Sequence, residues 1–374
     1  MRANRTGRNR NFVVLGGVGA IGRVVVRDLF ESHPRNHIVV ADYNAEAARC
    51  HARRFHSRRV TAVFADARQP KQLAGVFRGN TVVINCTQHD FNLQVMQAAL
   101  AAKLHYVDLG GLFYWTRRQL KLDPGFRRAG LTAVLGMGCS PGITNVMTRA
   151  GVEKLTRVDS VRIRVGSKDF NGQPADFFFP YSAQTIVEEL TLRPWVFESG
   201  RFHQVNPRTG WERVRFPRPV GTKWVVRTRH SEVATIPGSF AYAGLSHCDF
   251  AVSFDRGFVR EVVKRLANGW TAREFARLPT PRAKPNDYEV SRVIASDKRR
   301  TICVDCHARA NRRWHASAGD VDTGCPPSIV AQMIASGVIT KRGVLAPEVA
   351  VPVIPFFREL RRRRMRIEIR ESKA

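Results

Sequence analysis

The chain has 374 residues, of which 44% are apolar, so it is long enough for two folded domains and too apolar for a disordered chain. No uninterrupted apolar run approaches the roughly 20 residues that cross a bilayer, which excludes a membrane-spanning helix. Lys and Arg number 61 against 31 Asp and Glu, a net charge of +30, but the basic residues are spread along the chain without a nucleic-acid-binding module, which argues against nucleic acid as a partner.

The basic residues 1–10 precede an apolar stretch, an order that superficially imitates a secretory signal. Glycines in the spacing of a phosphate-binding turn interrupt that stretch, and no small-residue cleavage site follows it. The seven cysteines are an odd number scattered over the chain, so they do not form a disulfide framework. We therefore expect a cytoplasmic protein with flexible basic termini at 1–10 and 369–374.

From residue 11 to about 138, apolar runs rich in β-branched residues alternate with helical patterns. The runs predict strands at 12–16, 38–42, 61–66, 81–86, 105–110 and 131–138, and the helical patterns predict helices at 20–32, 45–55, 71–77 and 91–103. Because the strands are continuously apolar, helices should cover both faces of a parallel sheet. The pattern predicts an α/β fold, a doubly wound Rossmann domain, over 11–138.

The character of the sequence changes after Pro141-Gly142. Strands at 159–167 and 223–228 alternate in polarity, and an aromatic cluster occupies 177–181. This indicates an inserted mixed α+β domain over 139–319. A helix is then predicted at 326–337 with proline in its first turn, and the basic run 361–364 follows an amphipathic stretch as a solvated helix end.

The run Gly17-Val18-Gly19-Ala20-Ile21-Gly22 lies between the first predicted strand and helix, as in dinucleotide-binding domains. Gly17 permits a tight turn, Gly19 lets the backbone approach a pyrophosphate, and Gly22 lets the helix pack closely. The helix N-terminus would stabilise the phosphate charge.

Asp42 ends the second strand, 20 residues after Gly22, where it can accept hydrogen bonds from the adenosine ribose. Its charge would repel a 2′-phosphate, so we expect NAD rather than NADP, although Arg49 or Arg53 could still neutralise such a phosphate. Asp66 ends the third strand, where it either contacts adenine or caps the strand end.

Several segments together resemble the saccharopine dehydrogenase family. They are VVINCTQHDFNLQVMQAAL, HYVDLGGLF, LGMGCSPGITN, HSEVATIP and ASAGDVDTGCPPSIVAQM, and the resemblance extends from about residue 11 to 368. It implies that 320–368 completes the Rossmann domain and that 139–319 is a catalytic and dimerisation domain, so we expect a homodimer. It also implies NAD(P)-dependent chemistry on a C–N bond of an amino-acid substrate. Lysine 6-dehydrogenase-type oxidation with release of ammonia is one alternative, and a non-catalytic dinucleotide-binding protein with a basic docking surface is another.

The resemblance also indicates a site at the carboxyl edge of the sheet. Cys86 and Thr87 lie at the end of the fourth strand, where their backbone would face the nicotinamide ribose. Asp108, at the YVD position, would handle the proton of a substrate amine, unless it serves as a cap or structural hydrogen-bond acceptor.

The substrate-binding candidates come from two segments. The turn of Gly138, Ser140, Pro141 and Gly142 resembles the family's hinge between domains. From the inserted domain, Tyr181 and Ser182 would face the cofactor. His230 is the candidate general base because imidazole titrates near neutral pH, with a structural histidine as the alternative. Arginines such as Arg164 could bind a substrate carboxylate.

The run Cys303-Val304-Asp305-Cys306-His307 has the C-x-x-C-H spacing of c-type haem attachment. Haem attachment normally follows export, and the surrounding residues have the alternation of a strand. We therefore expect ordinary strand cysteines and no metal centre.

Overall fold

The computed structural model describes residues 10–171, 177, 179, 181–278 and 284–373, which fall into two compact units. The first unit comprises 1–146 and 320–363, and the second comprises 147–319 and 364–374. Helix α7 (Ile143–Val152) spans the division, eight residues after the predicted boundary at 138.

The first unit contains a parallel sheet. Over the described residues it has seven strands in the order β15-β6-β5-β4-β1-β2-β3, and every pairing is parallel. The strands are β1 (Asn11–Leu15), β2 (His37–Asp42), β3 (Val60–Phe64), β4 (Val82–Asn85), β5 (His105–Asp108), β6 (Thr132–Val134) and β15 (Gly343–Leu345). Phe12 to Leu15 of β1 are at most 1% exposed, because helices cover both faces. The predicted doubly wound α/β fold is confirmed.

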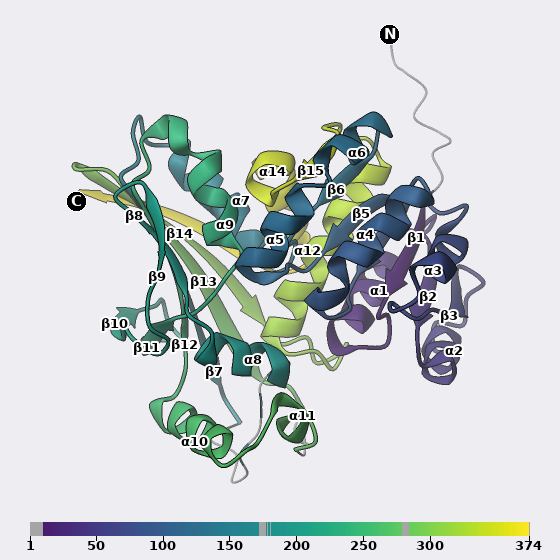
Figure 1. Cartoon of the computed structure of the whole chain (residues 1–374), viewed down its shortest axis with the longest axis horizontal. Coiled ribbons are helices and arrows are strands. Elements are labelled where there is room, and N and C mark those ends of the chain that lie inside the picture. Colours follow the sequence, from purple (N-terminus) through teal and green to yellow (C-terminus); the bar gives the residue numbers. More distant parts are fainter. Residues whose placement is uncertain (1–9, 172–176, 178, 180, 279–283, 374) are drawn as a thin grey trace. The chain divides into compact units, whose positions relative to one another are not determined.

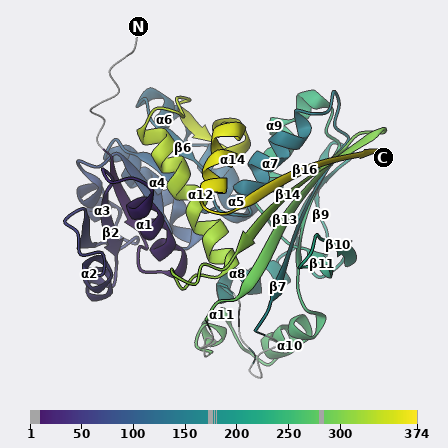
Figure 2. The ribbon, with the colours of Figure 1, turned by 180° about the vertical axis from the view of Figure 1, so that it is seen from behind.

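The helices of this unit are α1 (Ala20–Ser32), α2 (Ala45–Arg53), α3 (Pro70–Phe77), α4 (Asn92–Ala101), α5 (Leu112–Leu120), α6 (Asp123–Arg128), α12 (Ala318–Ala335), α13 (Pro347–Ala350) and α14 (Val353–Arg362), with a short 3₁₀ turn η1 (His89–Phe91). Figure 1 shows α4 and α5 on one face of the sheet, and Figure 2 shows α1 and α12 side by side on the other.

The return helix α12 differs from the prediction for 326–337. It begins at Ala318, so Pro326 and Pro327 lie inside the helix rather than in its first turn. The part of α12 that precedes the prolines packs closely on α1, because a Cβ on Gly324 would lie 2.6 Å from Val24 Cγ1. Ser328 donates a hydrogen bond of 2.6 Å to Asp28. Arg361 and Arg362 form the last turn of α14, as predicted. The prediction of a solvated helix end is wrong for Arg363, whose side chain is 9% exposed and binds Asp28.

The second unit contains a mixed sheet, as expected for the inserted α+β domain. Over the described residues nine strands form it, with the main path β10-β11-β12-β7-β13-β14-β16 and with β8 and β9 attached through β12. They are β7 (Ser160–Asp169), β8 (Trp195–Glu198), β9 (Arg201–Gln204), β10 (Glu212–Arg215), β11 (Thr222–Arg227), β12 (His247–Ser253), β13 (Asp287–Ser296), β14 (Arg300–Arg309) and β16 (Arg366–Lys373). Its helices are α8 (Ala183–Thr191), α9 (Glu232–Ser239), η2 (Ala241–Ala243), α10 (Arg256–Ala267) and α11 (Ala272–Phe275).

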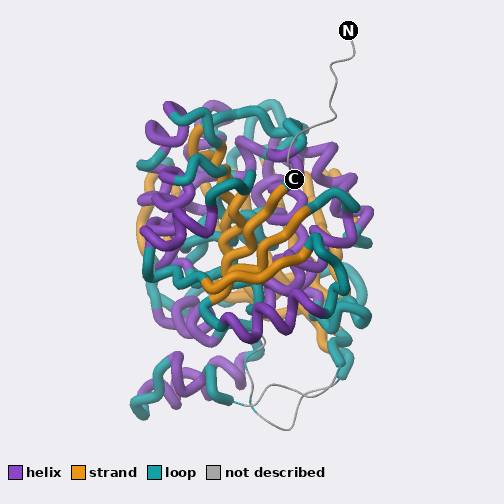
Figure 3. Tube along the Cα trace, turned by 90° about the vertical axis from the view of Figure 1, so that its right-hand side faces the viewer, coloured by secondary structure: helices purple, strands orange, loops and turns teal. Residues whose placement is uncertain are grey.

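The expectation of a flexible tail at 369–374 is wrong for the residues that the structure describes. Residues 366–373 form strand β16, which pairs antiparallel with β14 and places Ile369 opposite Val304. Figure 3 shows this strand leading to the C-terminus. Residues 364–368 therefore belong to the second unit rather than completing the first. Of the segment 1–10, only Arg10 is described, and its guanidinium bonds Asn36 and Gln332.

Among the described residues, no helix is both long and apolar enough to cross a membrane.

Candidate functional site

The glycine-rich turn joins β1 to α1, and its left-handed residue is Gly16. This residue has φ +76°, and a Cβ there would lie 2.9 Å from the Cys86 carbonyl oxygen. Gly17 must be small for another reason, because a Cβ would lie 2.8 Å from Val40 Cγ1. At Gly22 a Cβ would lie 2.1 Å from the Gly16 carbonyl oxygen, which fits the predicted close packing of helix on turn. Sequence reasoning missed Gly16, although a Gly-Gly pair is a turn signal.

The first turn of α1 offers backbone donors to an anion. Gly19 precedes the helix without a side-chain cap, and the first turn contains no acidic residue. The first N–H groups of a helix have no intrahelical acceptor and lie at the positive end of its dipole. The backbone of Ala20 and Ile21 is therefore suited to a phosphate, as predicted for this turn. The Val18 N–H instead donates to Asp42 Oδ2 at 3.2 Å.

Asp42 connects the end of β2 to the glycine turn. Its side chain is 3% exposed, and besides the Val18 N–H its carboxylate accepts the Asn44 N–H at 3.0 Å. Each carboxylate oxygen has two acceptor positions, so both oxygens retain capacity for a ribose diol. This geometry fits the predicted role in ribose recognition.

Asp66 lies beyond the end of β3 and is bound by its own loop. Its carboxylate accepts hydrogen bonds from Arg68 Nε at 2.9 Å and Arg68 Nη2 at 2.7 Å. These hydrogen bonds hold the pKa of the Asp66 carboxyl below its usual range. The contacts fit the strand-end alternative better than a free acceptor for adenine.

Cys86 and Thr87 follow β4 at the same edge. The Cys86 N–H donates to the Leu15 carbonyl at 2.8 Å, and Thr87 Oγ1 donates to Asn85 Oδ1 at 2.7 Å. Burial, with a smaller contribution from the charge of Asp108, raises the pKa of the Cys86 thiol, so it remains protonated. The backbone of these residues thus forms one wall of the glycine turn.

Asp108 is fully buried and accepts hydrogen bonds from four protein donors. They are the Tyr106 hydroxyl at 2.9 Å, Gln119 Nε2 at 2.5 Å, and the N–H groups of Gly110 at 3.0 Å and Gly136 at 2.6 Å. Burial raises the pKa of the Asp108 carboxyl, while these donors oppose that effect. Among the two alternatives left open by the sequence, this arrangement favours a structural acceptor. Sequence reasoning missed Gln119, which lies on a helix that was not predicted.

The turn of Gly138, Ser140, Pro141 and Gly142 is tightly closed. The Gly138 N–H donates to the Pro141 carbonyl at 2.7 Å, and Gly142 has φ +128° with no space for a Cβ beside Gly138. Ser140 Oγ is buried without a hydrogen-bond partner among the described residues. It is therefore the side-chain donor of this turn that a ligand could use.

In the second unit, His230 lies between two carboxylates. Its Nδ1 is 2.9 Å from Glu232 Oε2, its Nε2 is 3.3 Å from Glu189 Oε1, and its ring stacks on Phe250 at 3.7 Å between centroids. Burial alone would lower the pKa of His230, but the charge of Glu232 and the hydrogen bonds that the ring donates to both carboxylates raise it to about 9. The side chain is thus an imidazolium at neutral pH. The sequence predicted a general base because an ordinary imidazole titrates near neutral pH, and the raised pKa of His230 does not meet that condition.

Tyr181 joins this cluster, because its hydroxyl donates a hydrogen bond to Glu189 Oε2. Ser182 caps α8, accepting the Thr185 N–H at 3.4 Å, which gives its hydroxyl a structural contact. Sequence reasoning missed Glu189 and gave Glu232 no role, although it placed the segment 230–232 beside the cofactor. Glu232 is two residues from the histidine and was visible as a possible partner, whereas Glu189 comes from a different helix.

The C-x-x-C-H run lies in β14, as predicted. Alternation along the strand places Cys303 and Cys306 on opposite faces, so they cannot chelate one ion together. Donor atoms of Asp305, His307 and Glu368 lie within 4.8 Å of one another. Asp305 already binds the guanidinium groups of Arg292 and Arg370, and Arg370 also binds Glu368, so we assign no metal here.

Arg164, a candidate ligand for a substrate carboxylate, is 1% exposed and makes bidentate bonds to Asp249 at 2.8 and 3.0 Å. Its guanidinium is therefore committed to the fold of the second unit.

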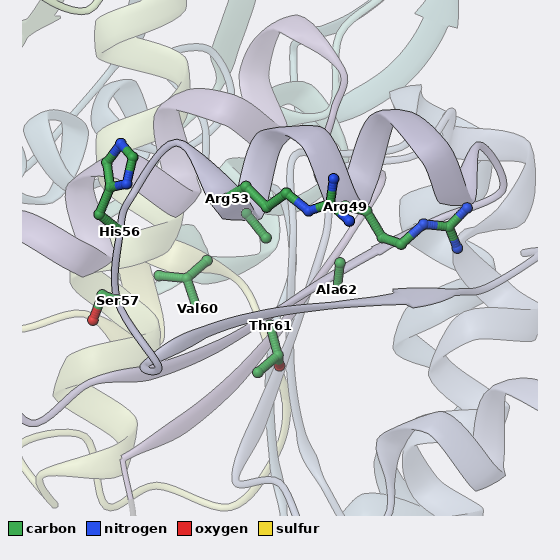
Figure 4. A pocket seen from close by; sticks show the side chains of 8 residues that line it. Arg49, Arg53, His56, Ser57, Val60, Thr61 and Ala62 are labelled. Carbon is green, nitrogen blue, oxygen red and sulfur yellow. The ribbon is translucent and has the colours of Figure 1, made fainter.

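A pocket of about 310 Å³ lies between α2 and the edge strand β3 (Figure 4). Arg49 and Arg53 line it from the helix, and residues 60–62 line it from the start of the strand. Arg53 is the last residue of α2 and lines this pocket together with residues at the amino end of β3, whereas Asp42 stands at the carboxyl end of β2. This position does not suit Arg53 as a ligand for a 2′-phosphate beside Asp42.

The parallel sheet with its glycine turn and Asp42 defines a dinucleotide-binding protein of the Rossmann class. Comparison with known families then covers nearly the whole chain: the saccharopine dehydrogenase NADP binding domain matches residues 12–134, and the saccharopine dehydrogenase C-terminal domain matches residues 138–365. The chain therefore belongs to the saccharopine dehydrogenase family, as its motifs indicated.

Two relatives illustrate the similarity. The carboxyaminopropylagmatine dehydrogenase of a Synechocystis species is 22% identical over 274 residues, which cover 69% of this chain and 66% of that protein. The chain thus matches slightly less than two thirds of that relative. The apo structure of L-Glu-forming saccharopine dehydrogenase from Saccharomyces cerevisiae matches 98% of this chain and 100% of its own, with a TM-score of 0.74 and 16% identity. At that identity the match establishes a shared fold.

Proposed function

We propose that this protein is an NAD-dependent oxidoreductase that acts on a C–N bond of an amino-acid substrate. The observation that carries the proposal is the buried Asp42, hydrogen-bonded to the glycine turn and able to accept a ribose diol. A bound nicotinamide dinucleotide would supply the hydride chemistry. The chain's own residues bind and orient it, through the start of α1 and the walls formed by Cys86 and Thr87.

The choice of NAD over NADP rests on charge. The matching family description names NADP, but a carboxylate at the end of β2 repels a 2′-phosphate, and Arg53 lies toward the other end of β3. The Asp42 side chain therefore supports NAD.

The substrate class rests on the family and on the chemistry of the second unit. The cyanobacterial relative is by name a dehydrogenase of a compound with carboxy and amino groups. We propose His230, held as an imidazolium, as a proton donor, with Tyr181 bonded to Glu189, one of the two carboxylates beside the histidine. Ser140 Oγ and the backbone of 138–142 are the proposed substrate contacts in the first unit. As the resemblance implies, we also expect a homodimer, which light scattering would test, and a cytoplasmic location.

The test of the cofactor assignment compares two neighbouring acids. Asp42→Ala should weaken NAD⁺ binding at least about tenfold, the size of one or two lost hydrogen bonds to a charged group. Glu46→Ala removes an exposed acid from the adjacent first turn of α2 and should change the affinity less than about twofold. An unchanged dissociation constant in Asp42→Ala would contradict the cofactor assignment.

The reaction is tested by NAD⁺ reduction against a panel of amino acids, polyamines and saccharopine, with ammonia measured in parallel. Ammonia release from lysine would favour the lysine 6-dehydrogenase alternative. Steeply salt-dependent DNA binding without turnover of any panel member would favour the non-catalytic alternative.

A further inference from the structure

Arg68 is a highly exposed arginine held in one orientation beside the proposed cofactor site. Its side chain is 71% exposed, yet Nε bonds both Asp66 oxygens, at 2.9 and 3.1 Å, and Nη2 bonds Oδ2 at 2.7 Å. The Arg68 N–H donates to the same carboxylate at 2.9 Å. The guanidinium plane is thus fixed while one or both of its faces remain open to solvent.

The loop that carries this ion pair is itself fixed. Gln94 of α4 donates a hydrogen bond of 2.8 Å to the Ala67 carbonyl, and the Ala65 N–H donates to the Asp42 carbonyl at 2.9 Å. Because β2 and β3 are parallel neighbours with Asp42 opposite Phe64, Arg68 lies at the carboxyl edge next to the proposed ribose site.

A second exposed group lies on the same edge. Tyr43 follows Asp42 and is 71% exposed. Because Asp42 lies opposite Phe64 in the pairing of β2 with β3, Tyr43 and Arg68 both follow strand ends at this edge. A planar cation and an aromatic ring beside a ribose site are the groups on which a purine stacks.

We propose that Arg68 binds the adenine ring of the dinucleotide by stacking, and that Asp66 acts as a positioning residue that holds the guanidinium flat. This inference rests on the proposed cofactor function. It differs from the adenine contact predicted from the sequence, in which Asp66 itself would accept a hydrogen bond from the adenine amino group. In the structure Arg68 occupies both Asp66 oxygens.

The first test measures the binding of ADP-ribose, NADH, NADPH and nicotinamide mononucleotide to the full chain by calorimetry. Arg68→Ala should weaken the binding of ADP-ribose and of NADH about tenfold, as expected for the loss of a partly desolvated cation–π contact. The affinity for nicotinamide mononucleotide should not change. Arg78→Ala removes an exposed arginine from the end of α3 and is the matched control, expected to change nothing. A loss confined to NADPH would instead make Arg68 a 2′-phosphate ligand and overturn the proposal.

The second test separates positioning from direct contact. Asp66→Asn should weaken ADP-ribose in the wild-type background but add less than about twofold in the Arg68→Ala background, because its effect passes through Arg68. Nicotinamide hypoxanthine dinucleotide, which lacks the adenine amino group, should bind within about twofold of NADH. Additive losses, or strong rejection of the hypoxanthine analogue, would assign adenine recognition to Asp66 and refute the inference. If the wild-type chain binds neither NADH nor NADPH, the proposed function fails; if it binds them and Arg68→Ala binds equally well, only this inference fails.

Discussion

Gly22→Ala is the substitution for which the structure predicts the sharpest effect on the proposed cofactor site. An alanine Cβ would lie 2.1 Å from the Gly16 carbonyl oxygen and 2.8 Å from Gly17 Cα, and both atoms belong to the backbone. Overpacking typically costs about 1–3 kcal/mol, and a contact this short against backbone falls at the upper end of that range. Alanine also improves helix propensity by about 1 kcal/mol, so the expected net loss is about 2 kcal/mol. Because α1 must move from the turn, its N–H groups move as well, and NAD⁺ affinity should fall at least about tenfold.

The assay is differential scanning calorimetry, with the transition of the first unit identified by its upward shift on addition of NAD⁺. A loss of about 2 kcal/mol corresponds to a fall of about 4–8 °C in the melting temperature of a unit of this size. Gly75→Ala is the matched control, because Gly75 lies inside α3 with no atom within 4 Å of an added Cβ, and it should be neutral or slightly stabilising. If Gly22→Ala kept both the wild-type melting temperature and the wild-type affinity, the close-packing argument would be refuted.

Two further predictions concern the second unit, which contains five of the six tryptophans, so that tryptophan fluorescence reports its unfolding. Since the pKa of His230 is about 9 in the folded chain against about 6.5 when unfolded, its interactions stabilise the fold fully below pH 6.5, and this contribution of about 3 kcal/mol should be lost as pH rises through 9. His230→Gln should flatten that part of the urea-unfolding profile, and an unchanged slope between pH 6.5 and 9 would contradict the assigned imidazolium. Arg164→Met should lower the free energy of unfolding by about 3 kcal/mol, because it leaves the buried Asp249 with Arg227 as its main partner. The double variant Arg164→Met with Asp249→Leu should recover most of that loss. Equal stability of the single and double variants would show that the pair is not coupled.

Local signals predicted the first unit well. The periodicity of apolar residues placed α1 at its observed bounds and β1 to β5 within one or two residues at most ends, because each strand is buried on both faces and reads as an apolar run. The prediction of where α12 begins was wrong because Pro326 and Pro327 resemble first-turn residues. The residues before them are helical and pack through Gly324 against Val24, a long-range contact that the local sequence does not reveal. The prediction of a flexible C-terminal segment was wrong for a related reason. Its charged residues suggest a solvated chain, and only the pairing with β14 reveals a strand.

The residues of the candidate site were likewise predictable where their contacts are local, and not where their partners are distant in the sequence. Gly17, Gly22 and Asp42 belong to a local motif in which the spacing along the chain determines where the residues lie in space. The sequence was therefore sufficient to place them together. The surroundings of Asp108 and His230 depend instead on Gln119 and Glu189, which come from helices distant in the sequence. Those partners decide whether each group titrates near neutrality, so protonation states could not be assigned from residue type alone.

The excess of arginine becomes interpretable only through the acids that bind it. Asp28, Asp249 and Asp305 are each at most 3% exposed, and each binds at least one arginine side chain; Asp249 and Asp305 bind two apiece. With 31 acids for 61 basic residues, the buried carboxylates are the scarce partners. Removing Asp249 would leave Arg164, itself 1% exposed, with Glu212 as its main acidic partner, whereas removing Arg227 would leave Asp249 its bidentate bond. A buried charge that loses a partner costs more than an exposed one, so substitutions of these acids should be more damaging than substitutions of most arginines. The basic composition is therefore compatible with a stable fold, because a few buried carboxylates neutralise arginines that enter the interior, such as Arg164 and Arg363.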